Sequence, residues 1–129
     1  MTRTRRSAKD AGTAFERAIA NYLATALNDD RIDRRARNGI KDRGDITGLR
    51  AHGQRIVAEC KNTSRIDLGG WVAEAHLEAG NDDALTGVVI HKRKGITHPG
   101  RQYVTCTVDD LLALLTGVRH GHRAEEAIA

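Results

Sequence analysis

Three side chains in the middle of the chain have the residue types and the spacing for metal-assisted chemistry on an anionic substrate. They are Asp45 and, fourteen residues later, Glu59, which is followed by Lys61. Mg²⁺ takes oxygen ligands from one or two carboxylates, and the bound ion activates water and offsets charge on a phosphate. A neighbouring lysine can orient or deprotonate the attacking water, or stabilise negative charge. The pattern therefore indicates phosphodiester hydrolysis; the alternative is a solvent-facing Glu59–Lys61 pair with an ordinary loop aspartate.

Two predicted strands position these three residues. Residues 55–61 are predicted to form a strand in which alternate side chains point to opposite faces. The even-numbered residues are small and apolar and suit a core, whereas Glu59 and Lys61 share the other face. Residues 45–50 are the predicted partner strand of a hairpin. We therefore expect Asp45 to lie beside the charged pair.

A fourth acidic residue, Glu16, lies on the first predicted helix. Apolar residues recur at helical spacing from Phe15 to Leu27, and Glu16 borders this buried stripe. The segment from Thr13 to Glu16 also has the S/T-x-x-E form of a capping box. The sequence leaves open whether Glu16 completes the acidic site or caps the helix, since one carboxylate could hardly do both.

The remaining elements frame this site in the order αβββαββα. Hydrophobic periodicity predicts an α/β or α+β fold with a mixed sheet of about five strands flanked by helices. A further helix after Asp67 is expected to bury Trp71 and to turn Glu74 and Glu78 to solvent. In order, the predicted elements are a helix at 15–27, strands at 31–37, 45–50 and 55–61, a helix capped by Asp67, strands at 87–91 and 102–107, and a helix from Thr107 to Gly117.

The charge of the chain is segregated. Its 129 residues contain 21 Lys and Arg and 17 Asp and Glu, a formal net charge of +4. Residues 1–10 carry +3, residues 31–43 and 91–101 carry +4 each, and residues 74–83 carry −4. Basic clusters of this kind are typical of phosphate-backbone binding, with solvated loops as the alternative. The residues predicted to contact DNA are Arg3, Arg5, Arg6, Arg34, Arg35, Arg37, Lys41, Arg43, Lys92, Arg93 and Lys94.

Composition excludes several classes of protein. Aromatic residues make up 3%, too few for a base-stacking surface. No apolar segment is long enough for a membrane span, and no P-loop or Rossmann glycine pattern predicts a nucleotide cofactor. Cys60 and Cys106 match no paired metal spacing and are expected to be reduced. We expect a basic arm at 1–10, one domain at 11–117 and a mobile tail at 118–129.

On these residues the chain resembles the PD-(D/E)XK nuclease superfamily, and within it the archaeal-type (Hjc-like) Holliday junction resolvases and their phage relatives. The match in order and spacing runs over roughly residues 10–116, although Gly44 stands where the superfamily name has proline. The resemblance implies a restriction-endonuclease-like core and a metal site in which Asp45 and Glu59 hold Mg²⁺, or Mn²⁺ in its place. It also implies that Lys61 serves the attacking water and that Glu16 completes the acidic site.

The function implied is a Mg²⁺-dependent, structure-selective endodeoxyribonuclease. It would be a homodimeric Holliday junction resolvase in DNA recombination and repair, cytoplasmic in a prokaryotic cell or phage-infected host. Two active sites are needed to nick two strands symmetrically, and a two-fold dimer supplies them. The alternatives are a restriction- or repair-type nuclease on linear, flap or nicked DNA, and a non-catalytic DNA-binding module whose acidic cluster is structural.

Overall fold

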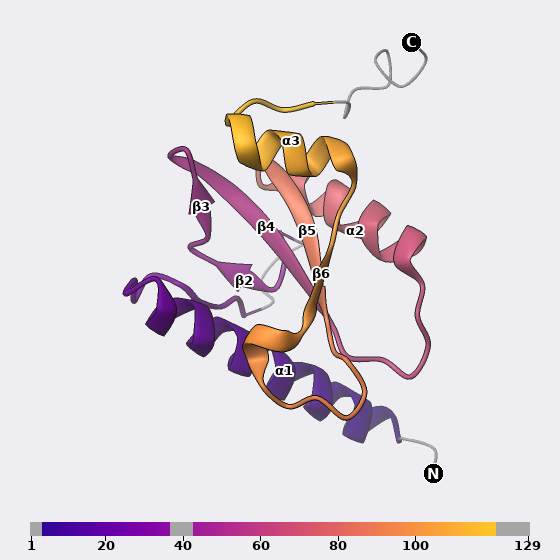
Figure 1. Ribbon diagram of the computed structural model, residues 1–129. Coiled ribbons are helices and arrows are strands. Elements are labelled where there is room, and N and C mark those ends of the chain that lie inside the picture. The colour runs from indigo at the N-terminus through magenta and orange to yellow at the C-terminus, as the bar shows by residue number, and fades with distance from the viewer. Residues whose placement is uncertain (1–3, 37–42, 121–129) are drawn as a thin grey trace.

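The computed structural model describes residues 4–36 and 43–120. Within these residues the fold is α+β, with three α-helices and a mixed sheet of six strands (Figure 1). The helices are α1 (Arg5–Ala26), α2 (Leu68–Asn81) and α3 (Val108–Thr116), and a short 3₁₀-helix, η1, spans Pro99–Arg101. The strands are β1 (Asp33–Arg34), β2 (Ile46–Thr47), β3 (Arg50–Ala51), β4 (Gln54–Lys61), β5 (Thr86–His91) and β6 (Tyr103–Thr105).

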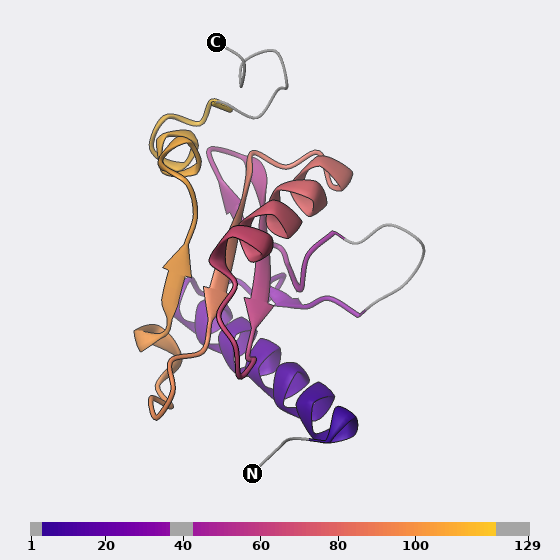
Figure 2. The same ribbon diagram turned by 90° about the vertical axis from the view of Figure 1, so that its right-hand side faces the viewer.

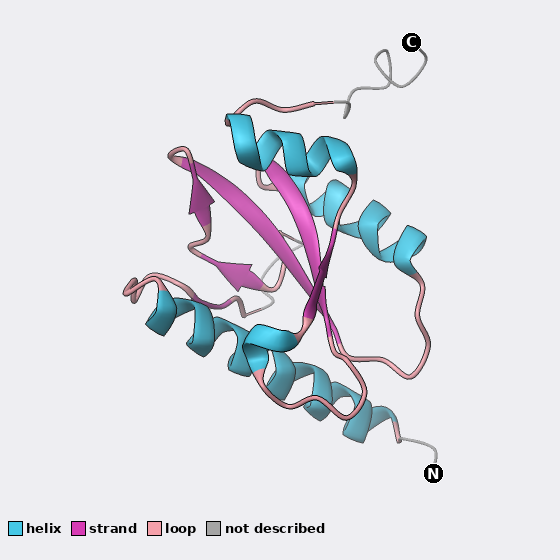
Figure 3. Ribbon diagram, in the orientation of Figure 1, coloured by secondary structure: helices cyan, strands magenta, loops and turns pink. Residues whose placement is uncertain are grey.

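The sheet is built around the parallel pair β4 and β5. Its order is β1-β2-β4-β5-β6, and β3 pairs separately with β4. All pairs except β4–β5 are antiparallel. Parallel neighbours require a crossover, which here is α2, so this helix runs antiparallel to both central strands (Figure 3).

The predicted mixed sheet is confirmed, but it has six strands where five were expected. The predicted strand at 45–50 is divided into β2 and β3 by Gly48, whose φ is 89°. A Cβ at Gly48 would lie 2.4 Å from the carbonyl oxygen of Arg31. Only glycine accepts both this backbone conformation and this close approach, and the chain changes direction there.

Both faces of β4 are covered. On one face, Phe15 and Ile19 of α1 pack with Ile46, Ala58 and Cys60 in the largest core cluster. On the other face, α2 packs with Trp71 and Ala75 on Val89, and with Ala79 on Val57. Figure 2 shows α2 running alongside β4 and β5. Glu59 and Lys61 therefore lie beneath a helix rather than on an open face of the sheet.

The residue that allows α2 to lie so close is Gly87 on β5. A Cβ at this position would be 2.4 Å from the backbone oxygen of Ala75 and 3.3 Å from the Cβ of Ala79. The absent side chain lets the helix backbone touch the sheet, which sets the distance between the side chains of α2 and those of β4.

Helix α1 begins well before the predicted start. Its N-cap is Thr4, whose hydroxyl accepts a hydrogen bond from Ser7 N at 3.0 Å. Thr13 and Glu16 lie in the interior of the helix, where the backbone N–H groups already have partners, so the capping-box interpretation of Glu16 was wrong. The helix also includes residues 5–10, most of the segment expected to be an arm.

The capping residues of α2 and α3 are those predicted from the sequence. Asp67 accepts a hydrogen bond from Gly70 N at 3.1 Å, and Thr107 and Asp110 form the reciprocal capping box of α3. Gly117 ends α3 with a left-handed φ of 79°.

Cys60 and Cys106 are both free thiols, as predicted. None of the helices in the described part of the chain has the length and apolar character to cross a membrane.

Candidate active site

Asp45 and Glu59 meet across the pair of strands β2 and β4. Ile46 is paired with Ala58 in antiparallel register, which places Asp45 opposite Glu59 on the same face. Glu59 is 1% exposed and Asp45 is 5% exposed. Asp45 Oδ2 accepts a hydrogen bond from the backbone N–H of Cys60 at 2.8 Å, which fixes the orientation of its carboxylate. The hairpin thus brings the two acidic residues together, as the spacing predicts.

Lys61 lies between two glutamates. Its Nζ is 3.7 Å from Glu59 Oε1 and 2.6 Å from Glu74 Oε2. Burial lowers the pKa of Lys61, but the hydrogen bond to Glu74 and the negative charge of Glu59 outweigh burial, so its pKa is raised. The side chain is therefore an ammonium ion at neutral pH, suited to pairing with negative charge rather than to removing a proton from water.

Helix α2 supplies two further carboxylates, contrary to the expectation of a solvated acidic face. Glu74 and Glu78 are one helical turn apart, and Glu78 is 1% exposed. One carboxylate oxygen from each of Glu59, Glu74 and Glu78 lies within 4.8 Å of the other two. The signal was present in the sequence, because Glu78 follows Trp71 by seven residues and Ala75 by three, and both of those side chains are buried.

Crowding of acidic groups dominates the electrostatics of Glu59. Its Oε2 atom is buried and, while its neighbours are ionised carboxylates, has no hydrogen-bond donor among the described residues. When one carboxyl group of this cluster is protonated, its O–H group can donate a hydrogen bond to a neighbouring carboxylate. Burial raises the pKa of Glu59 to about 11, with further contributions from shared hydrogen bonds with Glu78 and Asp45 and from their negative charges. Among the described residues, the cation nearest to Glu59 is the ammonium of Lys61, which is hydrogen-bonded to Glu74 instead.

These carboxylates fit a divalent cation. Oxygen ligands of one Mg²⁺ at about 2.1 Å are at most about 4.2 Å apart, so the three glutamate oxygens need only small side-chain movements to share an ion. The buried oxygen of Glu59 without a donor is a further acceptor for such an ion. The residues that would hold it are Glu59 and Glu78, with Asp45 and Glu74 beside them.

Glu16 is not part of this group of carboxylates. It lies on α1, which covers the opposite face of β4, and it accepts a hydrogen bond from Arg34 Nε at 2.9 Å. Its negative charge is felt at Cys60, where burial and then the charges of Asp45, Glu16 and Glu59 raise the pKa of the thiol. The structure gives Glu16 an ion-pair partner, Arg34, and its predicted place among the metal ligands stays a prediction.

The residues predicted to contact DNA lie in several different parts of the structure. Arg3, Arg37 and Lys41 lie outside the described residues. Arg5 and Arg6 are exposed in the first turn of α1. Arg34 is paired with Glu16, and Arg35 and Arg43 line a cavity.

The basic residues after β5 are partly occupied by contacts within the chain. Lys92 Nζ donates hydrogen bonds to the carbonyl oxygens of Arg93, at 2.8 Å, and Ile96. The guanidinium of Arg93 stacks over the ring of Tyr103, 4.4 Å from its centroid. Lys94 is exposed.

Comparison of the chain with protein-family models, with curated proteins and with solved structures found no match.

Proposed function

We propose that this chain is a Mg²⁺-dependent endodeoxyribonuclease with a restriction-endonuclease-like core, and that its substrate is branched DNA, as for a Holliday junction resolvase. The observation that carries the proposal is the meeting of Glu59 with Asp45 and Glu78 in a buried position beside Lys61. Buried like charges are costly to a fold, and a metal site that acts on a phosphodiester is a physical reason to keep them together.

Each residue has a separate part in the reaction. Glu59 and Glu78 would hold the cation with Asp45 beside them, and Glu74 would fix the ammonium of Lys61 through the 2.6 Å contact. A bound Mg²⁺ lowers the pKa of water and offsets charge on the phosphate. Lys61, whose pKa is raised, donates hydrogen bonds to a non-bridging phosphate oxygen and stabilises the charge that develops there.

The reaction is hydrolysis of one phosphodiester bond. The water oxygen forms a bond to phosphorus, and the bond from phosphorus to the leaving sugar oxygen breaks. The proton that leaves the water passes to solvent, and the leaving oxygen takes up a proton from solvent. No oxidant or nucleotide cofactor is required.

Preference for a four-way junction follows from the resemblance and from the number of cuts required. Two symmetric nicks need two active sites, which a homodimer supplies by its two-fold symmetry. Basic segments of both copies would hold the DNA through its backbone, so that shape rather than sequence is recognised.

The test is cleavage of a labelled four-way junction and of a matched linear duplex, each with Mg²⁺, with Mn²⁺ and with EDTA. We expect paired nicks in the junction that depend on the divalent ion. Equal cutting of the duplex would replace the junction resolvase by a restriction- or repair-type nuclease. Binding without cleavage under every metal condition would leave a DNA-binding module and end the nuclease proposal.

Carboxylate-to-amide variants locate the site. Asp45→Asn, Glu59→Gln and Glu78→Gln should each reduce cleavage by at least about 100-fold while junction binding in EDTA is retained. Asp109→Asn, an exposed position on α3, is the matched control and should cut at the normal rate. Wild-type cleavage by Glu78→Gln would show that the α2 carboxylate takes no part, and wild-type cleavage by Glu59→Gln would overturn the site.

A further inference from the structure

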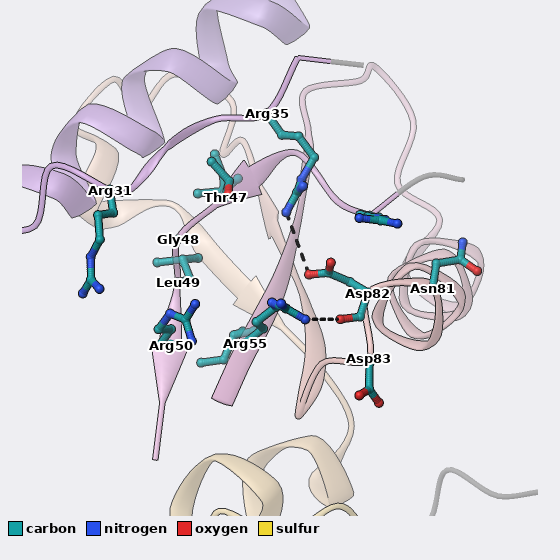
Figure 4. Close-up of a pocket in the computed structure, with 13 residues that line it drawn as sticks. Arg31, Arg35, Thr47, Gly48, Leu49, Arg50, Arg55, Asn81, Asp82 and Asp83 are labelled. Carbon is teal, nitrogen blue, oxygen red and sulfur yellow. Dashed lines mark hydrogen bonds and ion pairs between the residues drawn. The ribbon is translucent and has the colours of Figure 1, made fainter. Parts of the chain in front are cut away.

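A second charged feature lies at the C-terminal end of α2, beside the start of β4. It is a cavity of about 460 Å³, bounded by β2, β3, the ends of β1 and the residues after α2 (Figure 4). Its lining comes from two separate parts of the sequence, residues 31–56 and residues 81–83. Five arginines are among the residues that line it: Arg31, Arg35, Arg43, Arg50 and Arg55.

Two carboxylates also line this arginine pocket, and each has an arginine of its own. Asp82 is 3.8 Å from Arg35, an ion pair too long for a hydrogen bond, and Asp83 is 2.8 Å from Arg119, which lies outside the lining. Neither carboxylate cancels the remaining guanidinium groups. The lining therefore has an excess of positive charge.

Several donors in the pocket remain available to a ligand. Arg31 is bound by Asp29 at 2.8 Å, whereas the guanidinium of Arg55 has one hydrogen bond to the described residues, from Nη1 to the backbone oxygen of Asp82 at 3.2 Å. Arg35 Nε is buried and has no hydrogen-bond acceptor in the described part of the chain. A buried donor without an acceptor costs free energy, and an anion in the pocket would supply the acceptor.

We propose that the arginine pocket is a phosphate-binding site that takes a phosphate of a nucleic-acid backbone. The planar guanidinium group binds phosphate oxygens through two parallel hydrogen bonds, which an ammonium group cannot do. The volume is within the range of ligand-binding cavities and accommodates a phosphate with its attached sugar. Three of the five arginines, Arg35, Arg50 and Arg55, lie on or next to β1, β3 and β4, so the sheet holds them in place.

The position of the pocket relative to Glu59 favours a polymer. Arg55 precedes Glu59 by four residues on the extended strand β4, a distance of about 13 Å. That length corresponds to roughly four steps of a duplex at about 3.4 Å each. A strand cut at Glu59 could thus be held at a second phosphate by the arginine pocket. In this respect the inference rests on the proposed function, although binding of phosphate by the pocket does not.

The test compares two double variants that each remove two positive charges. Arg50→Gln with Arg55→Gln changes the pocket, and Arg65→Gln with Arg101→Gln changes exposed positions outside it. Binding of a fluorescent 20-base-pair duplex is measured in EDTA over a range of salt concentrations, so that cleavage does not contribute. We expect the pocket variant to bind about tenfold more weakly and its salt dependence to be shallower by roughly 1.8, the value for two lost phosphate contacts. The control variant should change much less.

Equal effects of the two double variants would overturn the proposal. Arg55 also holds the carbonyl of Asp82, so the single variant Arg50→Gln, at an exposed side chain, is measured too. It should lose about one unit of salt dependence with an unchanged melting temperature. An unchanged salt dependence in this folded variant would also count against the pocket.

Free nucleotide distinguishes the source of the phosphate. Deoxyadenosine 5′-monophosphate is added in a thermal-shift assay and as a competitor of the duplex. Weak competition of the nucleotide with the duplex supports binding of a backbone phosphate. The assignment to a polymer would be overturned if the nucleotide strongly raised the melting temperature through Arg50 and Arg55 while changes at these two residues left DNA binding unaffected. Binding of a four-way junction through these arginines, without its cleavage in Mg²⁺ or Mn²⁺, would end the proposed function and leave the pocket. Cleavage of the junction at the normal rate and affinity by the Arg50→Gln, Arg55→Gln variant would end the pocket proposal and leave the proposed function.

Discussion

Glu59 is the residue at which burial and charge conflict most directly. In the folded chain, burial and the neighbouring carboxyls of Glu78 and Asp45 raise its pKa from 4.5 to about 11. Between these two values the folded state keeps a proton that the unfolded state has released. The folded state therefore binds more protons, and the free energy of unfolding decreases as pH rises through this window. Without divalent cations, the chain should be more stable at pH 5 than at pH 8.

Replacement of Glu59 by glutamine should remove this penalty. The amide has nearly the shape of the protonated acid and carries no charge, so Glu59→Gln should stabilise the metal-free chain at pH 8 by about 1–2 kcal/mol. Urea unfolding at pH 5 and pH 8 measures the effect, which should be smaller at pH 5. The same variant should lose the rise in melting temperature that Mg²⁺ gives the wild type.

Asp10→Asn, an exposed change on α1, provides the comparison and should leave both the stability and its Mg²⁺ dependence unchanged. A Glu59→Gln chain that is less stable than wild type at pH 8 would contradict the crowding of carboxylates described above.

Individual residues were predictable where strand geometry alone determines position. Asp45, Glu59 and Lys61 come together because an antiparallel register and a period of two leave few other arrangements. Glu78 was missed because a glutamate on a helix is ordinarily solvated, and only its spacing from Trp71 indicated burial. Glu16 borders the buried stripe as predicted, but which face of the sheet α1 covers is a tertiary fact that helical periodicity cannot supply.

At the scale of elements, a capping motif in the sequence predicted the end of a helix correctly where the motif lay directly before an apolar helical pattern. The capping box of Thr107 and Asp110 is followed at once by apolar helical periodicity, and it was correctly placed. The similar pattern at Thr13 and Glu16 lies within a helix, because residues 5–12 continue the helix towards the N-terminus without an apolar stripe to indicate it. Gly48 divides a predicted strand because its backbone contacts Arg31, a long-range packing constraint.

Asp110 joins three elements, α2, β5 and α3, through hydrogen bonds to its carboxylate. Its carboxylate accepts hydrogen bonds from Thr107 N at 2.8 Å, from Thr86 on β5 at 2.7 Å and from His76 Nε2 on α2 at 2.8 Å. Burial would raise the pKa of Asp110, but these hydrogen bonds outweigh burial and its pKa is lowered. The stability it contributes is therefore present above pH 3.8 and is lost as pH falls through the lowered pKa.

Asp110→Asn should destabilise the chain by about 2–3 kcal/mol at pH 7, because a charged acceptor is replaced by a neutral one. The difference from wild type should shrink in urea unfolding as pH falls below 3.8. Asp109→Asn, the exposed neighbour, should change stability by less than about 0.5 kcal/mol. A loss that does not vary with pH would assign the role of Asp110 to its shape rather than its charge.

At the scale of the whole molecule, apolar side chains gather on the solvent side of α3. Val108, Leu111, Leu112 and Leu115 are exposed and recur at helical spacing, and α3 follows directly from the edge strand β6, where Val104 is also exposed. A stripe of this kind is a candidate contact for the homodimer that the proposed function requires.

Sedimentation of the wild-type chain should give a dimer, and the double change Leu111→Lys with Leu115→Lys should shift it to a monomer. The monomer should still bind DNA but should nick only one strand of a junction at a time. A wild-type chain that sediments as a monomer at micromolar concentration would contradict the homodimer while leaving the cleavage chemistry untouched.

The packing of α2 on β4 has one further consequence, for how the chain finds its register. Glu78 and Glu74 are about 6 Å apart along the helix, which nearly matches the 6.6 Å or so between Glu59 and Lys61 along the strand. A slip of α2 by one turn in one direction would move Glu78 from Glu59 to Lys61, where it would replace Glu74, and would bring Asp82 towards Glu59.

The charges therefore distinguish poorly between the native and the slipped alignment, and packing must select the native one. Gly87 receives the backbone of Ala75 at one turn of the helix, and Asp110 binds His76 at the adjacent position. Folding without a divalent ion should therefore populate slipped alignments of α2 that compete with the native one. A cation held by Glu59 and Glu78 would favour the native alignment during refolding.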